Sequence, residues 1–359
     1  MSELKGYGSD SRTLESAVAA GCPHAAAAAS AAADVVGAAD VTGTAATSAT
    51  PVTSAQRPAL KALPTDAFES AAAVSKGCGD GKTGTLLVNH GSRATIWRRM
   101  LLDVHTQVAD QLLAIPGVAQ VRTAYMEYTE PSIATQLKAF DEAGITDVLV
   151  VPLLLTVSDH SLDDIPAICG QPSSADLLQE LASENIEVYK PRADIQFAPL
   201  LDFSGLVRKN LAKRAAALMG PGVNDGQTTG LVLVGYGSAE FDDEWNTFFK
   251  QTRDHAEEDL GITASTHAWC GHLVEYSRKP TVDAINQMLE AVDQVIVIPQ
   301  LVSYDPMFQE RIIGRATTQS ADPSRVLYSA DAILPEPEVG NWVVRISQEI
   351  LTPVEAASA

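Results

Sequence analysis

Residues Thr85-Leu-Leu-Val-Asn-His-Gly-Ser-Arg93 form an apolar run that ends abruptly in a histidine, a glycine and a hydroxyl. Apolar and β-branched residues followed by small polar ones predict a buried strand that runs into a tight turn. Because residues 94–113 have helical spacing, this turn is a strand-to-helix junction. In an open α/β sheet such junctions lie at the carboxyl edge of the strands, where ligands bind. His90 therefore stands where chemistry is possible, although a histidine bound to a backbone carbonyl would give the same pattern.

Composition limits the class of protein. The chain has 359 residues, enough for two ordinary domains, and 46% of them are hydrophobic, which is typical of a globular protein. The formal net charge of −20 argues against nucleic acid and anionic membrane surfaces as partners. The sequence contains no run of about 18 or more strongly apolar residues, so no membrane span is predicted.

The cysteines indicate a reducing environment. Cys22, Cys78, Cys169 and Cys270 lie far apart and none belongs to a CxxC pair. This spacing is neither a disulfide framework nor a cysteine-based zinc or iron–sulfur site. We therefore expect a cytoplasmic protein without a secretory signal.

The sequence changes character after a long first segment. Residues 1–84 are rich in Ala, Ser and Thr and predict a disordered tail, because such side chains bury too little apolar surface to offset ordering entropy. From residue 85 strands and helices alternate, which predicts a parallel sheet covered on both faces. Expected strands are 85–88, 120–125, 147–155 and 186–189; expected helices are 94–113, 132–143, one from about 162, and 200–218. Residues 221–230 read as a linker to a second domain at 231–350.

An internal repeat supports two domains. Leu231-Val-Leu-Val-Gly-Tyr-Gly-Ser238 matches residues 85–92, and residues 297–312 echo 150–165. The pair Glu275-Tyr276 echoes Glu127-Tyr128. We therefore predict two copies of one three-layer α/β domain with a parallel sheet in each. A single long doubly wound sheet is the alternative.

The two copies differ in their histidines. Tyr236 stands in the second copy at the position of His90. Met307 stands at the position of His160, each eight residues after a proline. Whatever the histidines do, we expect it once per chain, with the second copy supplying scaffold and one wall of a cleft.

Four side chains in the first copy are candidates for chemistry. His90 follows the first strand, Glu127 and Glu130 follow the second, and His160 follows the third. Two imidazoles and a carboxylate at one sheet edge suit a divalent ion of Fe, Co, Ni or Zn. They equally suit acid–base catalysis near neutral pH. No Gly-rich phosphate loop follows a strand, so ATP use is not expected.

Structural roles compete with the functional ones. Glu130 also suits a residue before a helix-starting proline, and Ser92 suits a helix cap. Acidic and hydroxyl groups around His160 are better explained as helix caps than as metal ligands: Asp159, Ser161, Asp163 and Asp164. An exposed helix face or a patch for carboxylates would both explain three arginines: Arg93, Arg98 and Arg99. Of the other histidines, two are expected to be inert (His105 and His255) and two have open roles (His267 and His272).

Three segments together resemble a known family, the sirohydrochlorin cobalto-/ferrochelatase family of class II tetrapyrrole chelatases. They are Leu86-Leu-Val-Asn-His-Gly-Ser-Arg93, Tyr125-Met-Glu-Tyr-Thr-Glu-Pro-Ser132 and Val151-Pro-Leu-Leu-Leu-Thr-Val-Ser-Asp-His-Ser-Leu-Asp-Asp-Ile-Pro166. The family patterns are HGSR, an EPS or EPT loop, and VPLFL followed by a histidine and DIP. The resemblance covers residues 85–220 well and 230–345 more loosely, as in the long two-domain members.

The resemblance implies a lyase that inserts a divalent metal, Co²⁺ or Fe²⁺, into sirohydrochlorin without ATP, in cobalamin or siroheme biosynthesis. No cofactor is implied, because the metal (Co²⁺, Fe²⁺ or Ni²⁺) is a substrate. The family's metal-binding histidines map onto His90 and His160, with His90 also the proton acceptor, and its substrate-contacting glutamate maps onto Glu130. Its substrate loop maps onto residues leading to His160: Leu155, Thr156, Val157, Ser158 and Asp159.

The chemistry of insertion agrees with these residues. Because insertion expels two pyrrole protons, the site needs a base, and Glu127 is a candidate for relaying them. Arg93, with Ser92 at a helix N-terminus, is a candidate for holding the substrate's carboxylates.

The sequence also departs from the family. Asn89 replaces a glycine before the histidine, and Val157-Ser158-Asp159 replaces a more Gly-rich loop. A chelatase for another tetrapyrrole or for nickel, or a carrier that inserts nothing, therefore stays an alternative. Since an internal duplication often replaces a homodimer, we expect a monomer.

Overall fold

The computed structural model describes residues 73–77, 80–201, 203–220 and 226–352. The predicted disordered tail lies outside these ranges up to residue 72, as do residues 221–225 of the predicted linker. None of the helices within the described ranges is both long and apolar enough to cross a bilayer.

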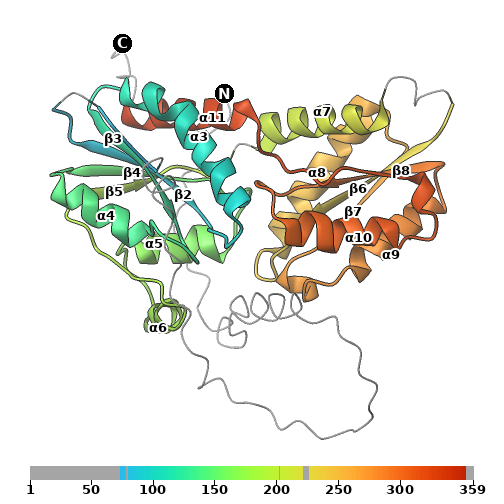
Figure 1. Ribbon diagram of the computed structural model, residues 1–359, viewed down its shortest axis with the longest axis horizontal. Helices are drawn as coiled ribbons and strands as arrows, with labels where there is room; N and C mark the ends of the chain where they lie inside the picture. Colours follow the sequence, from blue (N-terminus) through green and yellow to red (C-terminus); the bar gives the residue numbers. More distant parts are fainter. Residues whose placement is uncertain (1–72, 78–79, 202, 221–225, 353–359) are drawn as a thin grey trace, which may run out of the picture. The chain divides into compact units, whose positions relative to one another are not determined.

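The first half of the chain builds a five-stranded sheet in the order β1-β3-β2-β4-β5 (Figure 1). Its strands are β1 (Val74–Lys76), β2 (Thr83–Asn89), β3 (Val118–Tyr125), β4 (Asp147–Pro152) and β5 (Asp194–Phe197). Strands β2 to β5 are parallel, whereas β1 runs antiparallel to β3 at the edge. The central strands are continuous apolar runs because both faces of the sheet are covered.

Helices cover this sheet on both faces. Leu87, Val121 and Leu149 pack with the face that α3 covers, and Leu86, Val88 and Val150 pack with α4 and α5 on the other. The helices of this half are α3 (Thr95–Leu113), α4 (Ile133–Glu142), the π-helix η3 (His160–Asp164), α5 (Ile165–Ile168), α6 (Ala175–Ser183), the π-helix η4 (Phe203–Val207) and α7 (Arg208–Met219). The predicted three layers are confirmed.

The second half repeats the architecture with four parallel strands in the order β7-β6-β8-β9. This is the same order, counted along the chain, as β3-β2-β4-β5, which confirms the predicted duplication. Its strands are β6 (Thr229–Gly235), β7 (Ala264–Trp269), β8 (Gln294–Pro299) and β9 (Val326–Tyr328). Its helices are α8 (Asp242–Leu260), the 3₁₀ turn η5 (His272–Val274), α9 (Lys279–Leu289), the π-helix η6 (Met307–Gly314), α10 (Arg315–Thr318), the 3₁₀ turn η7 (Pro323–Arg325) and α11 (Pro337–Leu351).

The two halves exchange a helix. Helix α7, within the first predicted domain, packs against α8 and the second sheet, whereas α11, at the end of the second predicted domain, packs against α3 (Figure 1). Gln107 of α3 donates from its side-chain amide to the Pro337 carbonyl of α11 over 3.0 Å. Each sheet is therefore covered in part by a helix from the other half of the chain. The predicted domain boundaries at 220 and 231 assign α7 and α11 to the halves from which they come and not to the sheets that they cover.

Two predicted elements were wrong. Residues 74–76, assigned to the tail, form β1, so the ordered first domain begins before residue 85. The strand predicted at 186–189 is absent from the described residues; this segment is irregular and partly buried, and the fourth parallel strand is β5. An edge strand with alternating burial, such as β5, leaves a weaker apolar signal than the packed segment before it.

His105 shows why β1 belongs to the domain. Predicted to be an inert surface residue, it is 1% exposed and its two ring nitrogens bond to the Ser75 hydroxyl of β1 (3.0 Å) and the Thr123 hydroxyl of β3 (2.9 Å). Burial lowers the pKa of His105 to about 4. The folded protein therefore holds this ring neutral, and helix α3 is tied to the sheet edge through it.

We predict that His105 makes stability fall in acid. Since its folded pKa lies below the ordinary value of 6.5, its contribution is complete above pH 6.5 and lost as the pH falls toward 4. Over that interval the free energy of unfolding of the wild type should drop by about 3 kcal/mol more than that of His105→Gln. Urea unfolding at a series of pH values measures this. Parallel curves for H105Q and wild type would contradict the prediction.

Candidate metal-binding site

The site begins with the register of three parallel strands. Asn89 at the end of β2 pairs with Tyr125 of β3, and Val88 pairs with Pro152 of β4. The three strands therefore end at one edge of the sheet, and the residues that follow them meet there. His90 and Glu127 are thereby brought close together: the distance from His90 Nε2 to a Glu127 carboxylate oxygen is 4.0 Å.

His160 completes a cluster of three possible metal ligands. One ligand atom from each of His90, Glu127 and His160 lies within 4.8 Å of the other two. The two imidazole rings meet edge to face with centroids 4.7 Å apart. Side-chain exposure of 25% for His90 and 16% for His160 leaves the cluster open to an incoming ion, whereas Glu127 is 6% exposed and lies behind. Three protein ligands that leave a coordination position open suit a metal ion that binds only transiently.

Hydrogen bonds orient both rings. His90 Nδ1 donates to the Gly91 carbonyl at 3.1 Å, and His160 Nδ1 donates to the Asp164 carboxylate at 2.7 Å. With Nδ1 as the donor, the neutral ring carries its lone pair on Nε2. Both imidazoles are therefore set to offer Nε2 to an ion.

The two histidines titrate in opposite directions. Burial lowers the pKa of His90; the negative charge of Glu127 offsets this only in part, and the charge of His160 lowers the pKa further. Burial also lowers the pKa of His160, but its hydrogen bond to Asp164 and the charges of Asp164 and Glu127 outweigh burial, so the net shift is upward. The cluster thus pairs a ring that prefers to be neutral with one that keeps a proton more readily, as acid–base chemistry requires.

Backbone geometry at Gly91 sets the spacing between His90 and Glu127. Gly91 has φ +103°, and a Cβ placed there would lie 2.1 Å from the Glu127 carbonyl oxygen. The Glu127 N–H in turn donates to the His90 carbonyl at 2.8 Å. Only glycine permits this approach of the two loops.

Glu130 lies outside the cluster. Its carboxylate accepts from the Ser132 N–H at 2.6 Å, at the N-terminus of α4. Ser132 itself caps α4 by accepting from the Thr135 N–H. Of the two candidate glutamates, the structure therefore brings Glu127 to the histidines and gives Glu130 a capping contact.

The polar residues that follow His90 differ in their exposure to solvent. Ser92 accepts from the Ala94 N–H at 3.0 Å in the turn before α3. The expectation that Ser92 caps this helix is wrong, because Ala94 is the N-cap and no side chain makes a cap hydrogen bond to α3. Arg98 is buried and donates to the carbonyls of Ser92 and Arg93, which excludes it from an exposed helix face. Arg93 is exposed, with its guanidinium carbon 5.4 Å from the Tyr128 ring centroid.

The predicted substrate loop is buried at its start. Leu155 and Thr156 are about 5% exposed, whereas Val157, Ser158 and Asp159 are half-buried. Two of the residues expected to cap helices do not do so. Asp159 makes no side-chain cap hydrogen bond, and the Asp164 carboxylate binds His160 instead of a helix end. Burial and the nearby Glu240 raise the pKa of Asp159 to about 6.

The corresponding edge of the second sheet has kept the backbone and lost the ligands. Gly271 N–H donates to the Tyr236 carbonyl at 3.0 Å, as Glu127 N–H does to that of His90. The backbone position of Glu127 is therefore occupied by Gly271, four residues before the Glu275 that the sequence echo suggested. Tyr236, Gly271 and Met307 stand where His90, Glu127 and His160 stand in the first half.

Aromatic side chains gather at this second edge. The Tyr236 ring lies 5.4 Å from His272 and 5.6 Å from Phe308, and its hydroxyl lies 3.2 Å from that of Tyr276. Burial lowers the pKa of His272; the charge of Glu240 opposes this lowering and the charge of His160 adds to it. His267, by contrast, packs between Phe249 and Trp269 and bonds to Asn246, as a structural residue does.

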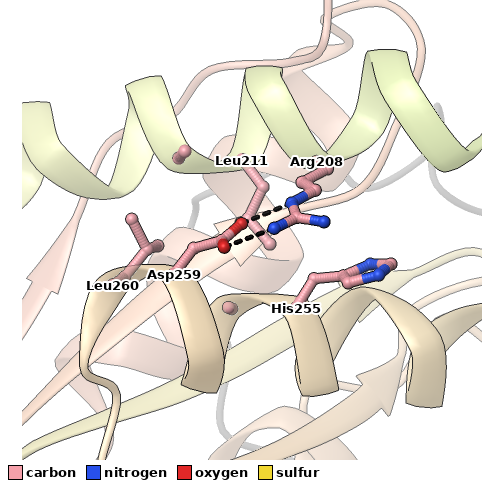
Figure 2. A pocket seen from close by; sticks show the side chains of 7 residues that line it. Arg208, Leu211, His255, Asp259 and Leu260 are labelled. Atoms are coloured by element: carbon pink, nitrogen blue, oxygen red, sulfur yellow. Dashed lines mark hydrogen bonds and ion pairs between the residues drawn. The ribbon is translucent and has the colours of Figure 1, made fainter.

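A hollow away from this cluster lies between α7 and α8 (Figure 2). Figure 2 shows the Arg208 guanidinium paired with both carboxylate oxygens of Asp259, beside His255. Because Arg208 and Asp259 satisfy each other, the hollow is explained by helix packing. His255 lines this hollow.

Sequence reasoning missed two residues of the cluster's surroundings. Asp164 follows His160 by four residues, a spacing that places both on one side of a helical turn and could have indicated the contact. Tyr128 has φ +66° and hydrogen-bonds to Glu127; burial and that carboxylate raise its pKa. A positive φ at tyrosine leaves no sequence signal.

Solved structures define the class of this fold as a two-domain chelatase fold. The sirohydrochlorin chelatase SirB from Bacillus subtilis subspecies spizizenii, in complex with cobalt, superposes with a TM-score of 0.52 at 19% identity, covering 75% of this chain and 94% of that one. SirB from Bacillus subtilis with Fe³⁺ superposes with a TM-score of 0.51 at 19% identity, covering 76% and 96%. At such identities the likeness concerns the fold.

Sequence comparison matches the first half of the chain to a family. Residues 84–218 match the CbiX family. The sirohydrochlorin cobaltochelatase of Methanosarcina barkeri is 32% identical over 87 residues, which cover 24% of this chain and 64% of that protein. That of Methanococcus maripaludis is 33% identical over 85 residues, covering 24% and 56%. The matches thus span less than two thirds of these relatives.

We predict that Gly91→Ala is strongly destabilising. The added methyl meets the Glu127 carbonyl at 2.1 Å and the residue must hold φ +103°, so the free energy of unfolding should fall by about 3 kcal/mol or more. Gly117→Ala is the matched control, because Gly117 has φ +88° but its nearest neighbour is 3.7 Å away; it should cost about 1–2 kcal/mol. Urea unfolding compares the two. Equal losses would show that the loops do not approach as closely as described.

Proposed function

We propose that this protein inserts Co²⁺ or Fe²⁺ into sirohydrochlorin without ATP. The observation that carries the proposal is the cluster of His90, Glu127 and His160 at one sheet edge in a chain whose first half matches the CbiX family. The cobaltochelatase activity of the relatives supports the substrate. We propose that the inserted metal is one of these two ions.

The chemistry of insertion accounts for each member of the cluster. A divalent ion must lose water, enter the macrocycle and displace two pyrrole protons. His90 and His160 hold the ion through Nε2 while it exchanges water for macrocycle nitrogens. His90, which burial keeps neutral, accepts the first pyrrole proton on Nε2 once the ion has left it, passes it to Glu127 at 4.0 Å, and then accepts the second.

The substrate's carboxylates need a positive partner in a protein of net charge −20. Arg93 is exposed three residues beyond His90 and is the candidate for that contact. The first turn of α3 contains no acidic residue, so its N-terminal N–H groups add to the attraction. The aromatic residues at the second edge, among them Tyr236 and Phe308, would face a flat ring across the site.

We propose in addition that the chain acts as a monomer. The two halves in one chain exchange helices as subunits of a dimer would, so the site is complete without a second copy.

The proposal predicts an asymmetric mutational pattern. Protein mixed with sirohydrochlorin and Co²⁺ should shift the visible absorption of the macrocycle faster than a protein-free control. His90→Ala and His160→Ala should each lower the rate by 10²-fold or more, because each removes a ligand or base. Met307→Ala, the matched position of the second half, should lower it less than about fivefold, since Met307 stands where the second half has no ligand cluster.

Two results would contradict the proposal. An unchanged spectrum relative to the protein-free control would favour a carrier of metal or tetrapyrrole. Equal losses for His160→Ala and Met307→Ala would place the chemistry elsewhere. Relative rates with Co²⁺, Fe²⁺ and Ni²⁺ determine the preferred metal.

We further predict that Asp164 tunes metal binding through His160. Asp164→Asn keeps the shape but removes the charge that orients the imidazole, and Co²⁺ affinity should fall by about 10–100-fold. Co²⁺ titration followed by visible absorption, without tetrapyrrole, measures this. Asp163→Asn is the control, because Asp163 is exposed in the same helical turn and makes no contact with His160 among the described interactions. Equal affinities for D164N and D163N would refute the role.

A further inference from the structure

We infer that Trp245, in the second half of the chain, is a positioning residue for the loop that carries His160. Its indole N–H donates to the Val157 carbonyl over 3.0 Å, three residues before His160. The inference rests on the proposed function, because it concerns how the metal ligands are held.

Trp245 is itself held in place. It is 6% exposed, stacks on Phe249 with centroids 6.1 Å apart and 26° between planes, and meets Trp269 edge-on at 5.8 Å. The indole nitrogen can only donate a hydrogen bond. Its packing therefore fixes the direction in which the donor points, and a buried donor holds its acceptor firmly because losing it leaves the N–H unpaired.

The loop side of this contact is continuous with His160. The Ser158 N–H donates to the Ser161 hydroxyl and that hydroxyl donates back to the Ser158 carbonyl, each over 2.9 Å. These bonds tie the end of the loop to the π-helix that contains His160 and Asp164. Fixing the Val157 carbonyl therefore fixes the chain immediately before that unit.

The opposite loop is braced in the same way by the second half. Asp305 stands one residue before Pro306, the N-cap of η6, and accepts from the Ser92 hydroxyl at 2.9 Å. Its other carboxylate oxygen accepts from the Met307 N–H at 2.9 Å, which holds it in position. Ser303 donates to the Trp97 carbonyl at 3.1 Å. The loop after β4 in the first half thus contacts α8, which follows β6, and the loop after β8 in the second half contacts the region after β2.

Bracing matters because His90 and His160 lie on separate loops. One ion must meet both imidazoles at once, so any freedom of either loop is lost on binding and subtracts from affinity. The Trp245 contact restricts the His160 loop before the ion arrives. The second half, which lacks its own ligands, then contributes to metal binding by pre-organising those of the first.

The test compares Trp245→Phe with Trp269→Phe in the full chain. Both remove an indole from the same aromatic group, but of the two only Trp245 donates to Val157 in the described structure. For W245F we expect the Kd for Co²⁺, measured without tetrapyrrole, and the KM for Co²⁺ in the insertion assay to rise by about 3–10-fold, somewhat less than for a residue bound directly to a metal ligand. The kcat at saturating Co²⁺ should stay within about twofold, since W245F leaves the three ligands and their chemistry intact. W269F keeps an aromatic ring beside Trp245 and the hydrogen bond to Val157, so it should change the Kd and both kinetic constants by less than about twofold.

A second variant separates the hydrogen bond from packing. Site-specific replacement of Trp245 by 3-benzothienylalanine keeps the shape of the ring and puts sulfur in place of the N–H. It should reproduce the weaker Co²⁺ binding of W245F. A Kd within twofold of the wild type for this isostere would overturn the inference, as would equal effects of W245F and W269F. If the wild type binds no Co²⁺ at all, the proposed metal site fails and the inference fails with it.

Discussion

Parallel pairing of β3, β2 and β4 is the constraint on which the rest of the protein depends. The backbone hydrogen bonds fix Asn89 beside Tyr125 and Val88 beside Pro152, so three loops leave the sheet at one edge. A shift of one residue in either pairing would turn the strand faces over and carry Glu127 or His160 away from His90. The buried faces of Leu86, Leu87 and Val88 make such a shift costly. Hydrophobic burial thus determines the position of polar ligands that take no part in it.

The same constraint operates twice, with different results. In the first half the loop after β2 meets the loop after β3, and in the second half the loop after β6 meets the loop after β7, through the same backbone hydrogen bond, at Glu127 in one and Gly271 in the other. The side chains on that common backbone are two histidines and a glutamate in the first half, and Tyr236, Gly271 and Met307 in the second. Since backbone bonds hold the loops in both, the second half could lose its ligands without losing its fold.

Exchange of α7 and α11 joins the halves into one unit. Leu211 of α7 and Val343 of α11 belong to one continuous apolar core with Leu87 of the first sheet and Leu233 of the second. The polar contacts of Ser92 with Asp305 and of Val157 with Trp245 follow the same reciprocal pattern. Such reciprocity is the geometry of a two-fold dimer, realised here within a single chain.

The sequence by itself determined the alternation of strands and helices, the duplication, the loss of histidines in the second copy and the sheet edge at which His90, Glu127 and His160 would meet. These features follow from local patterns: apolar runs, helical spacing, and repeated motifs at nearly constant offsets. Tertiary structure alone decided which glutamate joins the histidines, since Glu127 and Glu130 follow the same strand and differ only in the turn between them. It also decided that α7 covers the second sheet, that β5 rather than residues 186–189 extends the first, and that His105 is buried against β1. Each of these depends on which surfaces meet between segments far apart in the chain, and such meetings are set by packing across the whole fold and leave no local pattern.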